Sequence, residues 1–296
     1  MAKIIRNPNV EDYFVERTLA DAKAGPNGFI PDYEANRLIV LKDYRVPLDF
    51  EAFAAMSTNT ESADKAMQRV LKKVVSTHIM EATPESTLPV HQAVFKVFCK
   101  SDPELLRRAQ AAMKVAHDAA ISIFKTCFPT YEYFKLIPSV RLTQTMFENM
   151  HWDNHNIPED FQQVRIFVNL DQRPRVWNVS HNFVEYARSI YRERHLERFA
   201  GRDPNDLNDY VCGEVLGGSA GACLDTLPRH VVGFDPGEVW MGESRMLAHQ
   251  IFYGERAMVY MFFVKPEKML NPQRRFNAQV EALHREMAAA EPAIAA

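Results

Sequence analysis

The chain has 296 residues, of which 47% are apolar and 25% charged, and its formal net charge is −3. This length can bury a sizeable core, and the composition is ordinary for a globular protein. The small negative charge provides no overall basic field for nucleic acid or anionic lipid, so we expect a small-molecule partner.

No segment has the character of a membrane span or a secretion signal. No apolar run reaches the roughly 20 residues that cross a bilayer, and the N-terminal MAKIIRNPNVEDYF lacks the apolar centre of a signal peptide. The four cysteines (Cys99, Cys127, Cys212 and Cys223) lie far apart and form no CxxC pair. Reduced thiols in a cytoplasmic protein are the expectation. The sequence does not define the oligomeric state.

Residues 1–136 are expected to form a mainly helical region that packs on a sheet. Residues 1–35 contain many turn formers and predict an irregular lead-in. The branched residues of 37–42 predict one strand. Ser62 is a possible N-cap of a helix that would extend to Val74.

Ser101 to Glu104 is the clearest helix start in the chain. A capping residue there precedes a proline in the first turn, and an acid complements the helix dipole. Apolar residues then recur on one helical face up to Cys127, and Pro129 ends the helix. Core packing against a sheet is the simplest explanation of this face.

Residues 137–270 carry most of the strand patterns, with a helical insertion at about 182–212. Residues 271–296 predict a C-terminal helix and tail. Helices and strands do not alternate regularly, which argues against a Rossmann fold. The order of predicted helices and strands along the chain favours the α+β class, with an antiparallel sandwich or barrel and helices covering one face.

Three His-x-acid triplets occur, and their contexts differ. His195-Leu-Glu197 and His284-Arg-Glu286 lie in charged helical stretches, where a solvated face explains them. His151-Trp-Asp153 instead ends a strand-like run, and His249 lies in a second strand-rich segment. Short motifs of this kind also arise by chance, so the context carries the argument.

Strand geometry places His151 and Asp153 on one side of the chain, because alternate side chains share a face. Two imidazoles and one carboxylate leave three positions of an octahedron open, as in the facial triad of non-haem Fe(II) oxygenases. Those positions would accept 2-oxoglutarate and O2. A closed zinc site would need four protein ligands.

A basic side chain is expected beside this site. In Val164–Leu170 one face is aliphatic and the other carries Arg165, Phe167 and Asn169. A buried arginine needs a partner, and the distal carboxylate of 2-oxoglutarate is a natural one. An internal ion pair and an exposed edge position are the alternatives.

Other positions compete for the cosubstrate carboxylate. Val259 occupies the place where many enzymes of this class carry their arginine. This favours Arg165, with Arg256, Arg141 and Asn169 as the lesser cofactor-binding candidates.

Three passages within residues 140–264 together resemble a known family. They are His151-x-Asp153, then Val164–Leu170 followed by Pro174-Arg-Val-Trp177, and finally Pro236–Trp240 leading to His249 and Gly254. The chain resembles the Fe(II)/2-oxoglutarate-dependent dioxygenases, and most of all the Kdo 3-hydroxylase-like group, which acts on a sugar acid of bacterial lipopolysaccharide.

The resemblance implies a double-stranded β-helix, or jelly roll. It implies His151, Asp153 and His249 as catalytic Fe(II) ligands and Arg165 as the 2-oxoglutarate anchor. The activity would be hydroxylation of an unactivated C–H bond in a small, polar or acidic molecule, with 2-oxoglutarate decarboxylated to succinate. The segment after Asp153 and the turn at Glu255–Arg256 depart from the family pattern, so the sugar itself is not carried over.

Six residues are candidates to contact substrate, although core or surface placement explains each equally well: Thr143, Thr145, Asn149, Trp152, His155 and Arg175. Two other functions stay open. His151, Asp153 and His155 could hold zinc and activate water for hydrolysis, or the jelly roll could be a non-catalytic binding protein. The identity of the metal distinguishes iron chemistry from zinc chemistry.

Overall fold

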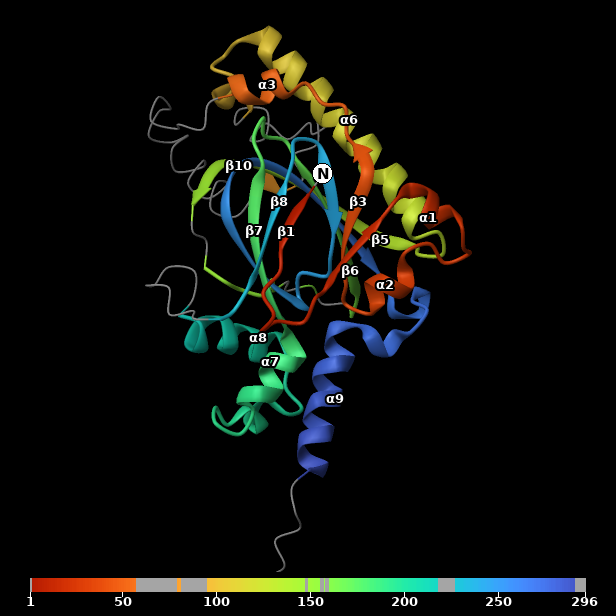
Figure 1. Cartoon of the computed structure of the whole chain (residues 1–296), viewed down its shortest axis with the longest axis vertical. Helices are drawn as coiled ribbons and strands as arrows, with labels where there is room; N and C mark the ends of the chain where they lie inside the picture. The colour runs from red at the N-terminus through yellow and green to blue at the C-terminus, as the bar shows by residue number, and fades with distance from the viewer. Residues whose placement is uncertain are drawn as a thin grey trace, which may run out of the picture.

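A computed structural model describes residues 2–56, 79–80, 95–146, 149–154, 157, 160–217 and 227–290. Its strands form one curled sheet that rolls up as a jelly roll, with helices outside it (Figure 1). The expected α+β jelly roll with helices on one face is therefore confirmed.

One long strand, β10 (Leu247–Val264), belongs to both halves of the roll. Its first part, up to Tyr253, pairs with β7. Its second part pairs with β5 from Tyr253 onward and with β6 from Ala257 onward. The register shifts between Gly254 and Arg256, where the strand passes from one half to the other. The remaining strands are ordered around it.

In one half, the second part of β10 has β5 (Tyr133–Met146) and then β4 (Ile79–Met80) along one edge. Along its other edge the sheet continues through β6 (Gln162–Asn169), β9 (Glu238–Met241), β3 (Leu38–Arg45) and β2 (Phe14–Arg17). The other half consists of three strands: β7 (Arg175–Asn182), β8 (His230–Phe234) and β1 (Lys3–Ile5).

The alternation predicted for residues 164–170 is present in β6. Val164, Ile166 and Val168 pack in the core between the sheet and the outer helices, whereas Phe167 belongs to the interior of the roll. The interior is aromatic: Trp240 stacks on Phe167 at 5.3 Å and on Phe234 at 3.8 Å between ring centroids. Because the two faces bury different side chains, the strand has only one favourable register.

The helix predicted from Ser101 is α6 (Pro103–Cys127). The Asp102 side chain accepts hydrogen bonds from the backbone N–H groups of Glu104 and Leu105, and the apolar face up to Cys127 is buried. Phe124 stacks on Phe262 of β10 with ring centroids 4.1 Å apart. The helix therefore covers the outer face of the sheet, with α1 (Leu19–Lys23), α2 (Ile30–Glu34) and α3 (Phe50–Ala55) beside it.

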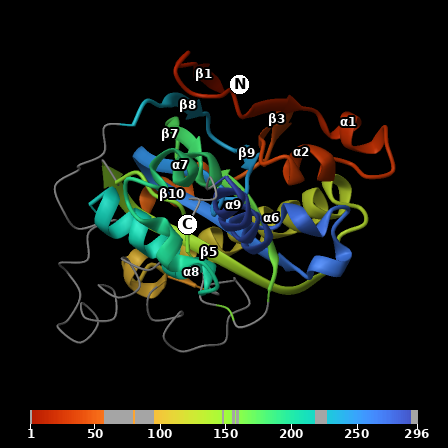
Figure 2. The same cartoon turned by 90° about the horizontal axis from the view of Figure 1, so that it is seen from below.

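A second group of helices gathers at one end of the roll (Figures 1 and 2). These elements are α7 (Phe183–Ile190), η1 (Leu196–Phe199), α8 (Pro204–Tyr210), η2 (Val211–Val215) and α9 (Phe276–Ala289), with short turns η3 (Pro266–Lys268) and η4 (Pro272–Arg274) before α9. Trp152 and Met246 share a core with this group. The helices thus pack next to the segment that carries His151 and Asp153.

The N-terminal segment differs from the expected irregular lead-in. It contributes β1, which pairs with β8, and β2, which pairs in parallel with β3. Strands of three and four residues are too short for a sequence period to reveal them. The helix expected from Ser62 to Val74 lies outside the described residues. Among the described helices, none combines the length and apolar character that a membrane span requires.

Candidate metal centre

His151, Asp153 and His249 converge at one point of the roll. Their potential ligand atoms all lie within 4.8 Å of one another. His151 and His249 face each other across an antiparallel bridge, in which each backbone N–H donates to the carbonyl of the other, at 3.1 and 3.0 Å. The loop after β5 and the first part of β10 therefore bring the two histidines together.

The backbone of Asp153 is held in place from two directions. Its N–H donates to the Ser244 carbonyl at 2.9 Å, and its carbonyl accepts from the Asn208 side chain of α8 at 2.8 Å. The carboxylate then lies between the imidazoles, with Oδ1 at 3.7 Å from His151 Nε2 and Oδ2 at 3.4 Å from His249 Nε2. The β9–β10 loop and the helical insertion thus both position this side chain.

Both imidazoles are oriented by the main chain. His151 Nδ1 lies 2.8 Å from the carbonyl oxygen of Asn149, and His249 Nδ1 lies 3.1 Å from that of Leu247. A carbonyl can only accept, so each Nδ1 carries the proton and each Nε2 presents a lone pair to the centre. Trp177 stacks on His249 with ring centroids 5.2 Å apart and fixes the plane of that ring.

The donor set fits a divalent transition metal. Bonds of about 2.1 Å to imidazole nitrogen and carboxylate oxygen place neighbouring octahedral ligands about 3 Å apart, close to the 3.4 and 3.7 Å separations found here. Burial by itself would raise the pKa of Asp153, but Arg165 and His249 outweigh it, and the pKa lies well below its usual range. The carboxylate is therefore available as an anion.

Solvent reaches the centre from one side. The side chains of His151, Asp153 and His249 are 27%, 21% and 7% exposed. A small molecule can therefore approach the first two residues, whereas His249 lies deeper, against the aromatic interior.

Arg165 lies within this centre and contacts Asp153 directly. Its Nη1 donates to Asp153 Oδ2, and its Nε donates to Gln163 Oε1 at 2.8 Å. The side chain is 8% exposed. The arginine predicted to face the interior of the roll does so, and its guanidinium is hydrogen-bonded to Asp153.

Two other cofactor-binding candidates lie away from the triad. The Asn169 side chain donates to the carbonyl of Arg173, in the turn after β6, and to that of Phe234, at the end of β8. Arg256 pairs with Asp171 at 3.4 Å and donates to the Met56 carbonyl at 3.1 Å. Both side chains hold backbone segments together.

Arg141 has a different position. Its neighbour Val140 packs in the outer core, so Arg141 takes the opposite face of β5, which is the face of Ile137 and the roll interior. In the ladder Arg141 stands beside Ala257, whereas Ile137 stands beside Met261, the partner of Arg165. Arg141 therefore lies two side-chain rows along the sheet from Arg165, and it is the more exposed of the two.

The substrate candidates have separate positions. The Trp152 indole donates to the His181 carbonyl at 3.2 Å and packs edge-on against Phe183, in the helical core. Asn149 is buried and its carbonyl orients His151. Arg175 is buried in β7 and lies over the backbone of Gly254. The side chains of Thr143 and Thr145, and all of His155, lie outside the described residues.

Of the other two His-x-acid triplets, one lies on the surface and the other contributes to a contact between helices. The His195 side chain is 76% exposed and lies 3.1 Å from Glu197. His284 Nδ1 is 2.6 Å from the hydroxyl of Tyr191. Neither histidine lies near the triad, in agreement with their charged helical surroundings.

The residues that support Arg165 were not predicted from the sequence. Glu243, in the β9–β10 loop, accepts hydrogen bonds from the backbone N–H groups of Gln163 and Arg245, at 3.0 and 3.2 Å. Burial raises the pKa of Glu243 to about 7, against the opposing effect of Arg245. Tyr33 of α2 hydrogen-bonds to the backbone of β6. Glu243 lies in a polar loop, and Tyr33 is 132 residues from Arg165 in the sequence. Neither position therefore carries a local sequence signal that it supports Arg165.

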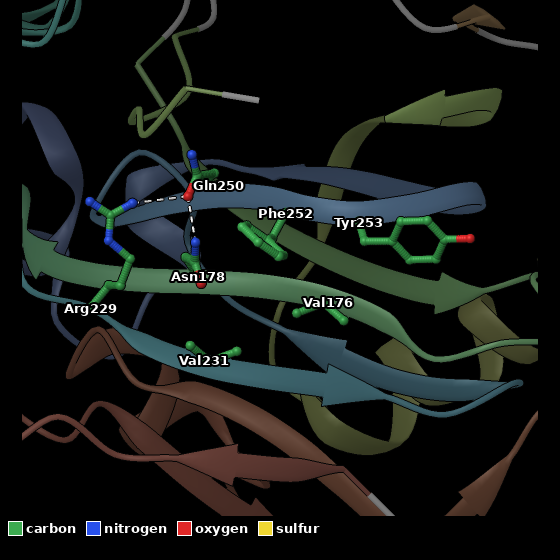
Figure 3. A pocket seen from close by; sticks show the side chains of 7 residues that line it. All are labelled: Val176, Asn178, Arg229, Val231, Gln250, Phe252 and Tyr253. Carbon is green, nitrogen blue, oxygen red and sulfur yellow. Dashed lines mark hydrogen bonds between the residues drawn. The ribbon is translucent and has the colours of Figure 1, made fainter. Parts of the chain in front are cut away.

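A pocket of about 780 Å³ lies on the outer face of the sheet (Figure 3). Gln250 accepts hydrogen bonds there from Asn178 and Arg229, at 2.5 and 3.0 Å. Because Gln250 follows His249 in β10, their side chains point to opposite faces. This pocket is therefore separate from the triad.

No protein-family model and no curated protein matches the sequence. The solved structures that match the fold include several of the Kdo hydroxylase KdoO, a non-haem Fe(II)/α-ketoglutarate-dependent dioxygenase. The apo form has a TM-score of 0.59 and 15% identity, covering 94% of this chain and 98% of that chain.

Two complexes of the same dioxygenase agree with this match. The cobalt(II) complex has a TM-score of 0.60 and 14% identity, covering 96% and 98% of the two chains. The complex with α-ketoglutarate and Fe(III) has a TM-score of 0.52 and 15% identity, covering 93% of each chain. The resemblance predicted from the sequence is confirmed at the level of the fold.

Proposed function

We propose that the chain is an Fe(II)/2-oxoglutarate-dependent oxygenase that hydroxylates an unactivated C–H bond of a small, polar or acidic molecule. One observation carries the proposal: the Nε2 atoms of His151 and His249 and the Asp153 carboxylate converge in a jelly roll. Two imidazoles and one carboxylate leave the open positions that such chemistry requires.

Bound at the triad, Fe(II) would use O2 and 2-oxoglutarate to oxidise the substrate, releasing succinate and CO2. The chain supplies the ligands and the surroundings. His151 and His249 keep Nε2 directed at the centre through their Nδ1 hydrogen bonds. Trp177 lies against His249, and the aromatic interior beyond it excludes water.

We infer that Arg141 meets the distal carboxylate of 2-oxoglutarate. The guanidinium of Arg165, favoured by the sequence, already contacts Asp153, and Arg256 pairs with Asp171. Arg141 lies on the interior face of β5, two side-chain rows along the sheet from Arg165. Nearby, the buried indole N–H groups of Trp177 and Trp240 have no hydrogen-bond partner among the described residues, and an oxygen-rich ligand would provide acceptors.

A small acidic substrate agrees with these surroundings. Arg141, Arg165 and Arg175 all lie on faces of the roll interior. The similar structures belong to a Kdo hydroxylase, and the family that the sequence resembles acts on a sugar acid. We also place the enzyme in the cytoplasm, because Cys99, Cys127 and Cys212 are free thiols.

The decisive experiment is anaerobic. Fe(II) and 2-oxoglutarate are added to the metal-free protein, and the weak visible charge-transfer band of the chelate is recorded. We expect a band in the wild type and in His195→Ala, the matched His-x-acid control. The band should be absent in Asp153→Ala and His249→Ala. Tight zinc binding without a band would instead support the hydrolase that uses His151, Asp153 and His155.

The cosubstrate anchor is tested by 2-oxoglutarate titration of the Fe(II) protein. Arg141→Ala should weaken 2-oxoglutarate binding by at least about 10-fold, since a charge-assisted hydrogen bond contributes about 1.5–3 kcal/mol. Arg256→Ala is the control. A loss confined to Arg165→Ala would return the anchor to Arg165.

A further inference from the structure

The contact between Arg165 and Asp153 is part of a longer series of contacts. Arg165 donates to Asp153 Oδ2 through Nη1 and to Gln163 Oε1 through Nε. Gln163 and Arg165 lie on the same face of β6, and Gln163 Oε1 also lies 3.5 Å from the hydroxyl of Ser244. The guanidinium is thus held at two nitrogens, which restricts its position relative to the carboxylate.

The backbone beneath Arg165 has an unusual neighbour. Strand β9 pairs with β6 only as far as Met241, opposite Ile166. Beyond that point the Tyr33 hydroxyl takes the place of a strand: it donates to the Gln163 carbonyl at 2.9 Å and accepts from the Arg165 N–H at 3.0 Å. Tyr33 is fully buried, and its ring packs edge-on against Phe128.

Glu243 completes this edge of β6. Its Oε2 accepts from the Gln163 N–H at 3.0 Å, and the N–H of Gly242 donates to the Arg165 carbonyl at 3.3 Å. Every backbone polar group of Gln163 and Arg165 on this edge therefore has a defined partner. The start of β6 is fixed by side chains and loop atoms, where a regular ladder is absent.

We propose that Arg165 is a positioning residue for the Asp153 carboxylate, and that the Tyr33 hydroxyl, acting through β6, fixes the position of Arg165. This inference rests on the proposed function, because the orientation of Asp153 matters for chemistry only when the triad binds a metal. It gives the N-terminal helix α2 a direct part in shaping the centre.

Two physical consequences follow. An N–H on Oδ2 favours the use of one carboxylate oxygen toward an ion, which preserves the open positions of a facial triad. The cation also offsets the negative charge of the Asp153 carboxylate that it contacts. Positioning and charge balance thus act on the same carboxylate.

The test measures Co²⁺ binding to the metal-free protein by calorimetry, together with the visible spectrum of the bound ion. Arg165→Met should lower Co²⁺ affinity by about 10–100-fold, the usual effect of losing a hydrogen-bonding partner of a metal ligand. Arg165→Lys should recover part of this loss. Tyr33→Phe should lower the affinity in the same direction, less strongly, and both Arg165→Met and Tyr33→Phe should alter the spectrum.

Tyr131→Phe is the matched control. Tyr131 is also a buried tyrosine beside α2, but its hydroxyl donates to Glu34 at 2.6 Å and does not reach β6. Its Co²⁺ affinity and spectrum should equal those of the wild type. Circular dichroism of each metal-free variant establishes that it folds, and if Arg165→Met does not fold, Tyr33→Phe and Arg165→Lys decide the matter.

The outcomes separate this inference from the proposed function. Wild-type affinity and an unchanged spectrum in Arg165→Met and Tyr33→Phe would overturn the positioning role, as would tighter binding, which simple repulsion between two cations predicts. Failure of the wild type to bind Co²⁺, or equal binding in Asp153→Ala, would instead overturn the proposed metal site itself.

Discussion

Individual side chains at the centre are set by hydrogen bonds to the main chain two residues away. His151 and His249 both place Nδ1 against the carbonyl of residue i−2, in Asn149 and Leu247. An extended backbone brings that carbonyl close to the ring, so the tautomer follows from strand geometry. The sequence pattern therefore carries the orientation of the imidazoles as well as their identity.

Glu243 gives the molecule a pH-dependent stability. Burial raises its pKa from the ordinary 4.5 to about 7, so the folded chain holds this proton more tightly than the unfolded chain. The stabilisation is complete below pH 4.5 and is lost as pH rises through about 7. We expect the free energy of unfolding of the wild type to fall between about pH 5 and pH 8 relative to that of Glu243→Gln, measured by urea denaturation. Parallel curves would contradict it.

Gly254 is required where β10 changes partner. A Cβ at this position would overlap the buried Arg175 side chain, including its Cγ at 2.9 Å. Arg175 is 1% exposed and has little room to move. Gly254→Ala should therefore cost about 1–3 kcal/mol of unfolding free energy, in the range of overpacked cores. Gly233→Ala in β8 is the control, since no atom lies within 4 Å of a Cβ there; equal effects would refute the steric argument.

At the scale of elements, β10 and β6 show how the roll places the site. The first part of β10 carries His249 beside β7, and its second part pairs with the strand that carries Arg165. The loop between β9 and β10 supplies Ser244 to Asp153 and Glu243 to Gln163. The centre therefore depends on strands β6 and β10 and on the loop that joins β9 to β10.

The N-cap of α6 is an element-scale test that leaves the centre untouched. Asp102 accepts from the N–H groups of Glu104 and Leu105, so Asp102→Ala should lower the free energy of unfolding by about 1 kcal/mol. Asp118→Ala on the exposed face of the same helix removes only a surface pair with Lys114 and should change it by less than about 0.5 kcal/mol. Chemical denaturation of both variants measures the difference, and the reverse order would contradict the capping role.

For the whole molecule, the triad joins parts of the chain nearly a hundred residues apart. A metal that binds the folded chain and not the unfolded chain stabilises it by mass action, about 2.7 kcal/mol at 100 times the Kd. We expect anaerobic Fe(II) or Co²⁺ to raise the thermal unfolding midpoint of the wild type in proportion to the logarithm of metal concentration. Asp153→Ala should show a much smaller rise. Equal rises in both proteins would place the ion elsewhere.

The resemblance to KdoO also holds at this scale. It spans nearly the whole of both chains although identity is 14–15%. A jelly roll depends on the alternation of apolar and polar faces along its strands, and on its turns, rather than on particular residues. The fold can therefore persist when the sequence has changed.

Features that depend on local periodicity could be predicted from the sequence: the two faces of β6, the buried face of α6, and the placement of His151 and Asp153 on one side of the chain. Side-chain direction repeats every two residues in a strand and every turn in a helix, so these follow from spacing alone.

The contacts between groups far apart in the sequence could not be predicted in this way, because they depend on the path of the whole chain. Arg165 contacts Asp153, Tyr33 completes the edge of β6, Arg256 pairs with Asp171, and Trp152 joins the helical core. Each contact joins two segments that are far apart in the sequence. The curl of the sheet and the point at which β9 ends determine how close these segments lie in space. Local spacing fixes which way a side chain points, whereas the path of the whole chain fixes what it meets.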